Sequence, residues 1–258
     1  MSVRRFEDKV VIISGGGTGI GKACAEAFAS EGAQVVITGR REKPLKDTAD
    51  KIKANGGKID YMTSDISKSS EVDSLIDHVT KKYKKLDIYV ANASMVMVAP
   101  IEETTDEDID RLVDINIKGN FYQLRKSTAV MKKQGFGNIV AMSSMSGNIG
   151  HSWMSLYCST KAAIINMVRA LALELATSNI RVNVVCPGTI DTPMPRGYAA
   201  STSDPDAVIE GFIEKEPMKR LGLSREVASV VLFLASDEEA SFVTGSAYDV
   251  DGGYQAGK

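Results

Sequence analysis

Short runs of β-branched and other apolar residues alternate with helical patterns along the chain. The runs predicted as buried strands are 10–13, 35–38, 59–63, 86–91, 137–143 and 182–186. The helices predicted between and after them are about 20–30, 44–54, 71–83, 106–133 and 155–177. Strands that alternate with helices form a parallel sheet covered on both faces. The sequence therefore predicts a single α/β domain over 1–258, a doubly wound parallel sheet in three layers (αβα).

The composition excludes several classes of protein. The chain of 258 residues is 43% hydrophobic and 25% charged, which is typical of a soluble globular domain. A net charge of -2 gives no general attraction to nucleic acid or to an anionic membrane. We find no signal peptide and no apolar run near the ~20 residues of a membrane span. Three cysteines indicate reduced thiols and a cytoplasmic protein, and two histidines exclude a histidine-rich metal centre, so no metal is predicted.

A glycine cluster follows the first predicted strand. Gly15, Gly19 and Gly21 are spaced as G-x-x-x-G-x-G, which differs from the strict G-x-G-x-x-G pattern. Glycines allow a tight turn, and the next helix then offers free N–H groups and a positive dipole end to a pyrophosphate. Between a strand and a helix, this loop predicts a dinucleotide site on a Rossmann-like fold.

The end of the second predicted strand bears on the choice of cofactor. In dinucleotide folds an acid here usually binds the adenosine ribose. Gly39 takes its place, and Arg40 and Arg41 follow directly. Guanidinium groups suit a 2′-phosphate. We therefore favour NADP(H) over NAD(H); the alternative is a solvated loop with Glu42 as an ionic partner.

Two Tyr-x-x-x-Lys pairs occur in the chain. Tyr157 and Lys161 lie one helical turn apart, after a predicted strand that ends near Ser144. A nearby ammonium should lower the pKa of a phenol and suit it to proton transfer with an alcohol or ketone oxygen. Tyr122 and Lys126 share the spacing but follow no such strand. We expect Tyr122 to pack on a neighbouring helix or subunit.

Along nearly its whole length the chain resembles the short-chain dehydrogenase/reductase family. The resemblance rests on the glycine motif, on Asp65, on Ala91-Asn92-Ala93-Ser94, and on the segment from Pro187 to Thr192. Ala91 and Ser94 replace the first Asn and the last Gly of the family's Asn-Asn-Ala-Gly motif. The family's catalytic residues correspond to Asn116, Ser144, Tyr157 and Lys161. The residues that the resemblance implies for the cofactor are Gly15, Gly17, Thr18, Gly19, Ile20, Arg40, Arg41, Asp65, Ile66, Asn92, Tyr157, Lys161, Pro187, Gly188, Ile190 and Thr192.

The resemblance also implies a reaction, in which NADPH reduces a carbonyl to a secondary alcohol, or the reverse. Ser144 would hold the carbonyl oxygen and Tyr157 would deliver the proton. Lys161 would lower the Tyr157 pKa and bind the nicotinamide ribose, and Asn116 would anchor a water that links Lys161 to solvent. The residues expected to face the substrate are Met95, Asn148, His151, Trp153, Met154, Met194 and Tyr198. This apolar, methionine-rich set suits a hydrophobic ketone, although several members could instead fill the core or a subunit interface.

Residues 193–217 break the alternation of strands and helices, and we predict a substrate lid there; the alternative is a surface excursion. Two other functions are considered. One is a 3-oxoacyl-(acyl-carrier-protein) reductase, although Gly135 and Ser178 stand where basic docking residues are typical, with Lys132 and Lys133 close by. The other is a non-catalytic NADP-binding scaffold or sensor.

The helices at 106–133 and 155–177 carry more apolar residues than one sheet face can cover. Family members pair these helices across a two-fold axis, so a homotetramer with dihedral symmetry is expected. At the start of the first helix, Thr104 and Glu107 have the spacing of a capping box.

Overall fold

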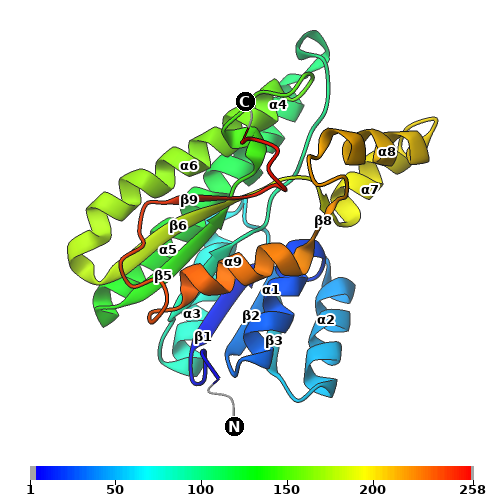
Figure 1. Cartoon of the computed structure of the whole chain (residues 1–258). Coiled ribbons are helices and arrows are strands. Elements are labelled where there is room, and N and C mark those ends of the chain that lie inside the picture. Colours follow the sequence, from blue (N-terminus) through cyan, green and yellow to red (C-terminus); the bar gives the residue numbers. More distant parts are fainter. Residues whose placement is uncertain (1–3, 257–258) are drawn as a thin grey trace.

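The structure is a computed structural model that describes residues 4–256. Its centre is a seven-stranded parallel sheet in the order β3-β2-β1-β4-β5-β6-β9 (Figure 1). The strands are β1 Val10–Ser14, β2 Gln34–Gly39, β3 Lys58–Thr63, β4 Ile88–Ala91, β5 Gly137–Met142, β6 Ile180–Pro187 and β9 Ala247–Val250. The predicted α/β fold is confirmed, and β9 is a strand that the sequence analysis did not identify.

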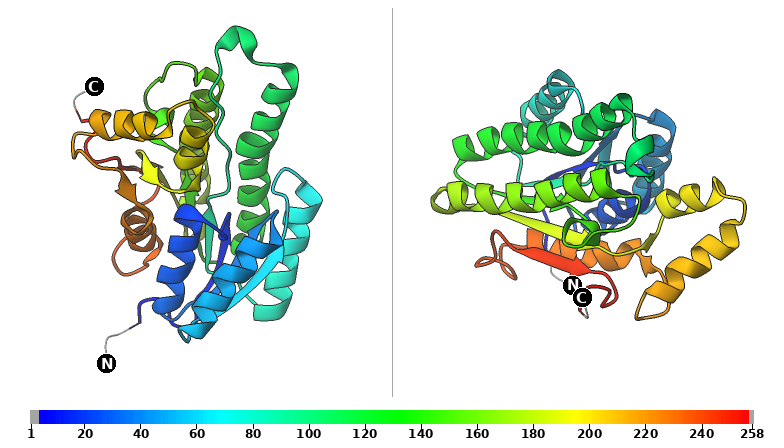
Figure 2. Two further views of the ribbon diagram at one scale, coloured as in Figure 1. Left: turned by 90° about the vertical axis from the view of Figure 1, so that its right-hand side faces the viewer. Right: turned by 90° about the horizontal axis from the view of Figure 1, so that it is seen from above.

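Helices cover both faces of this sheet. The helices that flank it are α1 Gly19–Ser30, α2 Glu42–Ala54, α3 Ser69–Tyr83, α4 Asp106–Val113, α5 Gly119–Gln134, α6 Ser155–Leu175 and α9 Ser224–Ala235. One apolar cluster joins α1, α2 and α9 to one face, and a second joins α3, α5 and α6 to the other. Figure 2 shows α9 and the pair α5 and α6 on opposite sides of the sheet.

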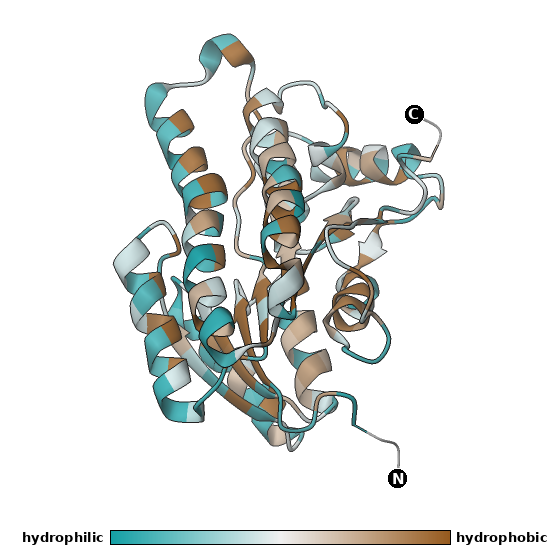
Figure 3. Cartoon of the chain, turned by 90° about the vertical axis from the view of Figure 1, so that its left-hand side faces the viewer, coloured by the Kyte–Doolittle hydropathy of each residue, from teal (hydrophilic) through white to brown (hydrophobic). Residues whose placement is uncertain are grey.

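The alternation of side chains along β1 explains why both faces are apolar. Val11 and Ile13 belong to the first cluster, and Val10 and Ile12 to the second. Successive side chains of a strand point to opposite faces, so a strand that is apolar throughout is buried on both. In Figure 3 the central strands are accordingly brown and the outer parts of the helices carry the teal.

The helix predicted over 106–133 is interrupted. A π-helical segment, Asp114–Lys118, lies between α4 and α5. The prediction of the capping box is wrong by a shift of one position, because Thr105 and Asp108 form the box. The Asp108 N–H donates to Thr105 Oγ1 at 3.1 Å. The Thr104 hydroxyl donates to the Pro100 carbonyl instead, at 3.1 Å.

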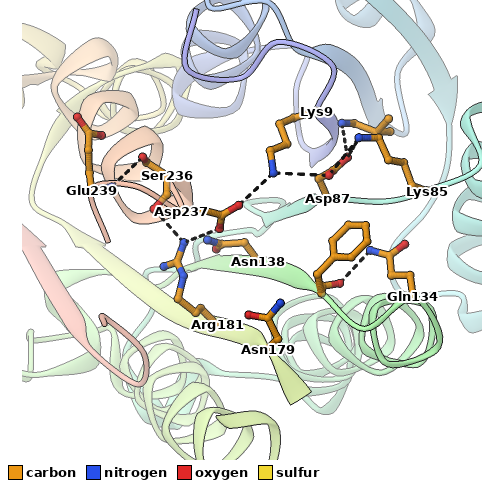
Figure 4. A network of polar contacts seen from close by, with 12 residues as sticks. Lys9, Lys85, Asp87, Gln134, Asn138, Asn179, Arg181, Ser236, Asp237 and Glu239 are labelled. Carbon is orange, nitrogen blue, oxygen red and sulfur yellow. Dashed lines mark hydrogen bonds and ion pairs between the residues drawn. The ribbon is translucent and has the colours of Figure 1, made fainter. Parts of the chain in front are cut away.

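The strand order reverses between β1 and β4, and this reversal positions the site. Chain segments leave the carboxyl ends of these two strands in opposite directions, which opens a crevice at that edge of the sheet. The opposite, amino edge is closed by a polar network (Figure 4).

Two short helices project from the body of the molecule beside this crevice. They are α7, Pro193–Ala200, and α8, Pro205–Lys215 (Figure 1). Their segment leaves and returns through a two-stranded parallel ladder of β7, Ile190–Asp191, and β8, Gly222–Leu223. Within residues 4–256, no helix is long and apolar enough to cross a membrane.

Candidate active site

A cleft of about 970 Å³ runs along the carboxyl edge of the sheet. All of the residues implied for the cofactor line it. They are Gly15, Gly17, Thr18, Gly19, Ile20, Arg40, Arg41, Asp65, Ile66, Asn92, Tyr157, Lys161, Pro187, Gly188, Ile190 and Thr192. Ser144 lines the cleft as well. The structure therefore brings together cofactor residues from segments that lie far apart in the sequence, from Gly15 to Thr192.

The glycine turn after β1 requires glycine for two reasons. Gly15 and Gly19 have positive φ angles of 69° and 54°. A Cβ added at Gly15 would lie 2.7 Å from Asn92 Nδ2, and one at Gly21 would overlap the Gly15 carbonyl. The Asn92 amide in turn donates to the Ser14 carbonyl at 2.8 Å, which ties the end of β4 to the turn.

The amino end of α1 is suited to an anion. Thr18 is the N-cap residue, and its side chain makes no capping hydrogen bond. The first N–H groups of α1 therefore face the cleft without a side-chain acceptor, at the positive end of the helix dipole. These features fit the pyrophosphate of a dinucleotide.

The adenosine end of the cleft lies at the ends of β2 and β3. Arg40 and Arg41 are exposed there, and neither forms an ion pair with Glu42 within the described residues. Asp65 accepts from the Ser67 N–H at 3.0 Å and its hydroxyl at 2.8 Å. Burial alone would raise the pKa of Asp65, but the bonds from Ser67 and the charge of Arg40 lower it. The Ser64 hydroxyl is buried without a described partner and lines the same end of the cleft, where it could bind a ligand oxygen.

Tyr157 and Lys161 occupy the middle of the cleft on α6. The Tyr157 side chain is 7% exposed, and burial raises its pKa to about 12 although hydrogen bonding with Ser144 opposes this. The expected lowering of the Tyr157 pKa by Lys161 is therefore not seen. The reason is geometric: Lys161 Nζ lies 5.7 Å from the Tyr157 ring centroid and donates to the Met142 carbonyl at 3.1 Å.

Lys161 is a buried cation without an anionic partner. Its side chain is 1% exposed, and burial lowers its pKa to about 8. None of the carboxylates in residues 4–256 lies within ion-pair distance of it. The Met142 carbonyl accepts from only one of the three N–H groups of this buried ammonium. Unsatisfied buried donors are costly, and the hydroxyls of a bound ribose would supply further acceptors.

Asn116 is buried behind the cleft and does not line it. Its Oδ1 accepts from the Met95 N–H at 2.9 Å, and its Nδ2 donates to the Met95 carbonyl at 2.9 Å and to Thr160 Oγ1 at 3.1 Å. The side chain therefore ties the segment after β4 to α6, one residue before Lys161. The Asn116 amide thus bonds protein groups and positions the segments that carry them. These bonds give no support to the expectation that Asn116 anchors a water between Lys161 and solvent.

The substrate end of the cleft contains most of the residues expected there. Those that line it are Met95, His151, Trp153, Met154, Met194 and Tyr198. Asn148 was also expected, and that expectation is wrong: its side chain is exposed and donates to Asp249 Oδ1 at 3.2 Å. The sequence analysis missed Phe212, Lys215 and Tyr254, which line the cleft from α8 and the C-terminal segment.

The second Tyr-x-x-x-Lys pair lies outside the cleft. Tyr122 packs against the second apolar cluster with the Arg125 guanidinium 5.4 Å from its ring centroid. Lys126 forms an ion pair of 2.8 Å with Asp77 of α3. Neither residue lines the cleft. Two pairs with the same spacing therefore have unrelated surroundings, and only the first faces a ligand site.

No group of three or more His, Cys, Asp or Glu side chains within residues 4–256 is arranged to hold a metal ion. A phenol, a hydroxyl and an ammonium, those of Tyr157, Ser144 and Lys161, line the cleft.

Comparison with known proteins agrees with this geometry. Residues 15–255 match the protein family described as enoyl-(acyl carrier protein) reductase. A protein described as an uncharacterized oxidoreductase, from Thermotoga maritima, is 39% identical over 97% of this chain and 99% of its own length. A 3-oxoacyl-(acyl-carrier-protein) reductase of the same organism is 36% identical over 96% of this chain and 98% of its own length.

A crystal structure of levodione reductase is similar to the whole fold. It has a TM-score of 0.94 and 32% sequence identity, and the match covers 98% of this chain and 100% of that one. The chain is therefore a member of the short-chain dehydrogenase/reductase family, whose members are oxidoreductases that use a nicotinamide cofactor.

Proposed function

We propose that this protein reduces a ketone to a secondary alcohol with NADPH, and catalyses the reverse oxidation. The observation that carries the proposal is the group of buried Tyr157, buried Lys161 and half-buried Ser144 in the middle of the cleft. When bound, NADPH would supply the hydride. The residues named above for the pyrophosphate, the ribose and the adenosine end would hold it.

The side chains around the reacting position can manage the proton. Because the pKa of Tyr157 is raised to about 12, its phenol keeps its proton at neutral pH and can donate it to the carbonyl oxygen. Ser144 hydrogen-bonds the same phenol and accepts from the Ser146 N–H at 3.1 Å, which fixes its hydroxyl beside the reacting oxygen. A proton lost by Tyr157 can be replaced through Lys161, whose pKa of about 8 lies close to neutral.

Preference for NADPH is supported at the end of β2. Arg40 and Arg41 are exposed beside Gly39, which stands where an acid usually ends that strand. Guanidinium groups bind a 2′-phosphate well.

Reduction of a 3-oxoacyl group carried by an acyl-carrier protein is the second candidate. It is supported by the 36% identity to an enzyme of that name. Lys132 and Lys133, in the last turn of α5, are exposed and could meet an acidic carrier.

We also propose that the protein is a homotetramer in the cytoplasm. Ile109 and Phe121 are 39% and 51% exposed on α4 and α5, and Leu173 is 84% exposed on α6. Burying such side chains against a second copy is favourable. Cys24, Cys158 and Cys186 are free thiols, which suits a reducing compartment.

The test is a panel of ketones and alcohols followed at 340 nm with NADPH, NADH and their oxidised forms. We expect turnover of bulky apolar ketones with a preference for NADPH. Higher kcat/KM on a carrier thioester than on any simple ketone would favour the second candidate. Cofactor binding without turnover of any carbonyl would overturn both and leave a non-catalytic scaffold or sensor.

A further inference from the structure

Three segments far apart in the sequence meet at the rim of the cleft. Lys215 is the last residue of α8, His151 lies in the loop after β5, and Tyr254 lies near the C-terminal end. All three line the cleft. The rings of His151 and Tyr254 are in contact, with their centroids 5.9 Å apart.

The position of Lys215 is fixed by the residue that follows it. Glu216 is 3% exposed, and its carboxylate accepts from the Thr189 N–H at 3.2 Å. The Thr189 carbonyl accepts from the Gly222 N–H at 2.9 Å. Thr189 lines the cleft directly after Pro187 and Gly188. Glu216 therefore holds the backbone at Lys215 near this segment, whose residues Pro187 and Gly188 are among those proposed to hold the cofactor.

The C-terminal segment packs against the same place. A Cβ added at Gly252 would lie 3.5 Å from Met218 Cγ, and one at Gly253 would lie 3.9 Å from Pro217. Residues 217–218 and 252–253 therefore lie side by side. Lys215 and Tyr254 therefore approach the cleft from adjoining segments.

The charges at this rim are unbalanced. Asp65 is the one acidic residue among the described residues that line the cleft, and it belongs to the adenosine end with Arg40. Lys215 is exposed, and no described carboxylate lies within ion-pair distance of its ammonium.

The carboxylates of the neighbouring segment are already bonded. Asp251 accepts from the N–H groups of Gly253 and Gln255, both at 3.0 Å. Asp249 accepts from the side-chain amides of Asn148 at 3.2 Å and Gln255 at 2.9 Å. An anion at the rim would therefore meet an ammonium that no acidic side chain neutralises.

We infer that Lys215 binds a carboxylate of the substrate, so that the natural substrate is an oxo acid with an apolar body. This inference rests on the proposed carbonyl reduction. The apolar body would pack on Trp153, Met154 and Phe212, and the carboxylate would lie at the rim made by Lys215, His151 and Tyr254. An ion pair at a partly enclosed rim adds selectivity that the apolar wall cannot supply.

The test compares each acid of a series with its methyl ester. The series consists of aryl oxo acids that have one to four methylenes between the carbonyl and the carboxylate. Acid and ester share the ketone and the aryl group, so only the negative charge differs. For the best acid we expect kcat/KM to exceed that of its ester by roughly 10-fold or more, the scale of one charge-assisted contact. In Lys215→Met this ratio should fall to near one, and Lys215→Arg should restore part of it.

Lys219→Met is the matched control. It removes the same charge from the same segment, but Lys219 does not line the cleft and its ammonium donates to the backbone carbonyl of Glu214. We expect it to leave the acid-to-ester ratio unchanged. If Lys215→Met lowers kcat/KM equally for the acid and its ester, the inference is overturned, because the lysine then affects the structure of the segment and not the charge of the substrate.

A second readout does not depend on turnover. Trp153 is the only tryptophan of the chain and lines the cleft, so its fluorescence should report binding. Acids should quench it at lower concentration than their esters in the unmutated protein and equally in Lys215→Met. If the acids bind selectively but no ketone is reduced, the proposed function fails, and only the binding of a carboxylate by Lys215 stands. If no acid of the series is preferred in either assay, or if Lys215→Met instead weakens NADPH binding, the inference is overturned; the second result would assign the lysine to a cofactor phosphate.

Discussion

The two edges of the central sheet differ in whether their charged side chains are paired. At the amino edge, the charged groups are paired in a continuous network (Figure 4). Asp87 accepts from the Val10 N–H at 2.8 Å and lies 3.1 Å from Lys85, while Asp237 lies 3.0 Å from Lys9 and 3.3 Å from Arg181. At the carboxyl edge, Lys161 is buried without a carboxylate.

This contrast separates residues that hold the fold together from residues kept for a ligand. The network ties the starts of β1, β4 and β6 to one another and to the end of α9, so its contacts are complete in the protein alone. The carboxyl edge leaves donors and cations unsatisfied, which costs stability that a bound cofactor restores. Substitutions at the two edges should therefore divide cleanly between loss of activity and loss of stability.

The largest effect should come from Tyr157→Phe. The change keeps the ring and removes only the proton donor, so kcat should fall by the ~10²–10⁴-fold typical of a lost general acid. NADPH affinity and the unfolding temperature should stay close to those of the unmutated protein. Steady-state kinetics on one ketone and a fluorescence titration with NADPH measure both.

Tyr122→Phe is the control within the same chain, because it has the same local spacing outside the cleft. It should keep kcat within a few-fold. Equal losses in the two variants would contradict the assignment of Tyr157.

The next largest effect concerns the adenosine end of the carboxyl edge. Arg40→Ala combined with Arg41→Ala should lower kcat/KM for NADPH by ~10- to 150-fold for each arginine that binds the 2′-phosphate, since one charge-assisted contact contributes on the order of 1.5–3 kcal/mol. NADH should be used as before, and so provides the internal reference. Equal kcat/KM for the two cofactors in the unmutated enzyme would refute the proposed preference.

At the amino edge, Asp87→Ala should destabilise the protein without changing the chemistry. It leaves the Val10 N–H without its acceptor and removes the anion beside Lys85, so the free energy of unfolding should fall by about 1–3 kcal/mol. Urea titration measures the loss, and kcat well below the unfolding temperature should be unchanged.

Asp77→Ala is the comparison for that variant. Asp77 is 64% exposed in its ion pair with Lys126, so its loss should cost less than about 1 kcal/mol. If Asp77→Ala lowers the free energy of unfolding more than Asp87→Ala does, the prediction is wrong, because it assumes that the buried carboxylate contributes more than the exposed one.

The smallest effect is a pH dependence of stability from Lys161. Its pKa is about 8 in the folded protein against 10.5 as the reference value. Between these values the unfolded chain binds the proton and the folded protein does not, so stability rises with pH through this window and is lost as pH falls toward 8. From pH 8 to 9.5 the cofactor-free protein should gain on the order of 1–2 kcal/mol that Lys161→Met does not gain.

The upper limit of that experiment is set by Tyr157. Its pKa is raised from 10.0 to about 12, so its contribution to stability is lost as pH rises from 10 to 12. Measurements should therefore stop below pH 10. A parallel response of the two proteins between pH 8 and 9.5 would show that Lys161 is not the titrating group.

Much of the fold could be predicted from local pattern. Strands that are apolar throughout, such as Val10–Ser14, and the glycine turn after them have periodicity and backbone requirements that a sequence displays directly. β9 was missed because its residues Ala247–Val250 lack the β-branched run of the inner strands and it lies at the edge of the sheet.

The site residues that directly follow strands could be predicted from the sequence. Those from α8 and the C-terminal segment were missed. Tyr254 enters the cleft because Asp251 holds a turn of Gly252 and Gly253, both with positive φ angles, and no periodicity predicts such an approach. The prediction that Asn148 faces the substrate was wrong because its amide donates to Asp249, a partner 101 positions away. The prediction that Lys161 lowers the Tyr157 pKa was wrong, because a spacing of four residues does not reveal that the Lys161 ammonium donates to the Met142 carbonyl.

The two-stranded ladder below α7 and α8 has an evolutionary consequence. Ile190 pairs with Gly222 and Asp191 with Leu223, so the segment between them begins and ends at neighbouring points. Arg196 with Asp191, and Arg220 with Glu226, secure the same junction. A segment whose ends already touch can be lengthened, shortened or exchanged for that of a relative at little entropic cost to the rest of the chain. Natural variation could therefore give this scaffold new substrates by replacing one cassette while the proton-transfer residues remain in place.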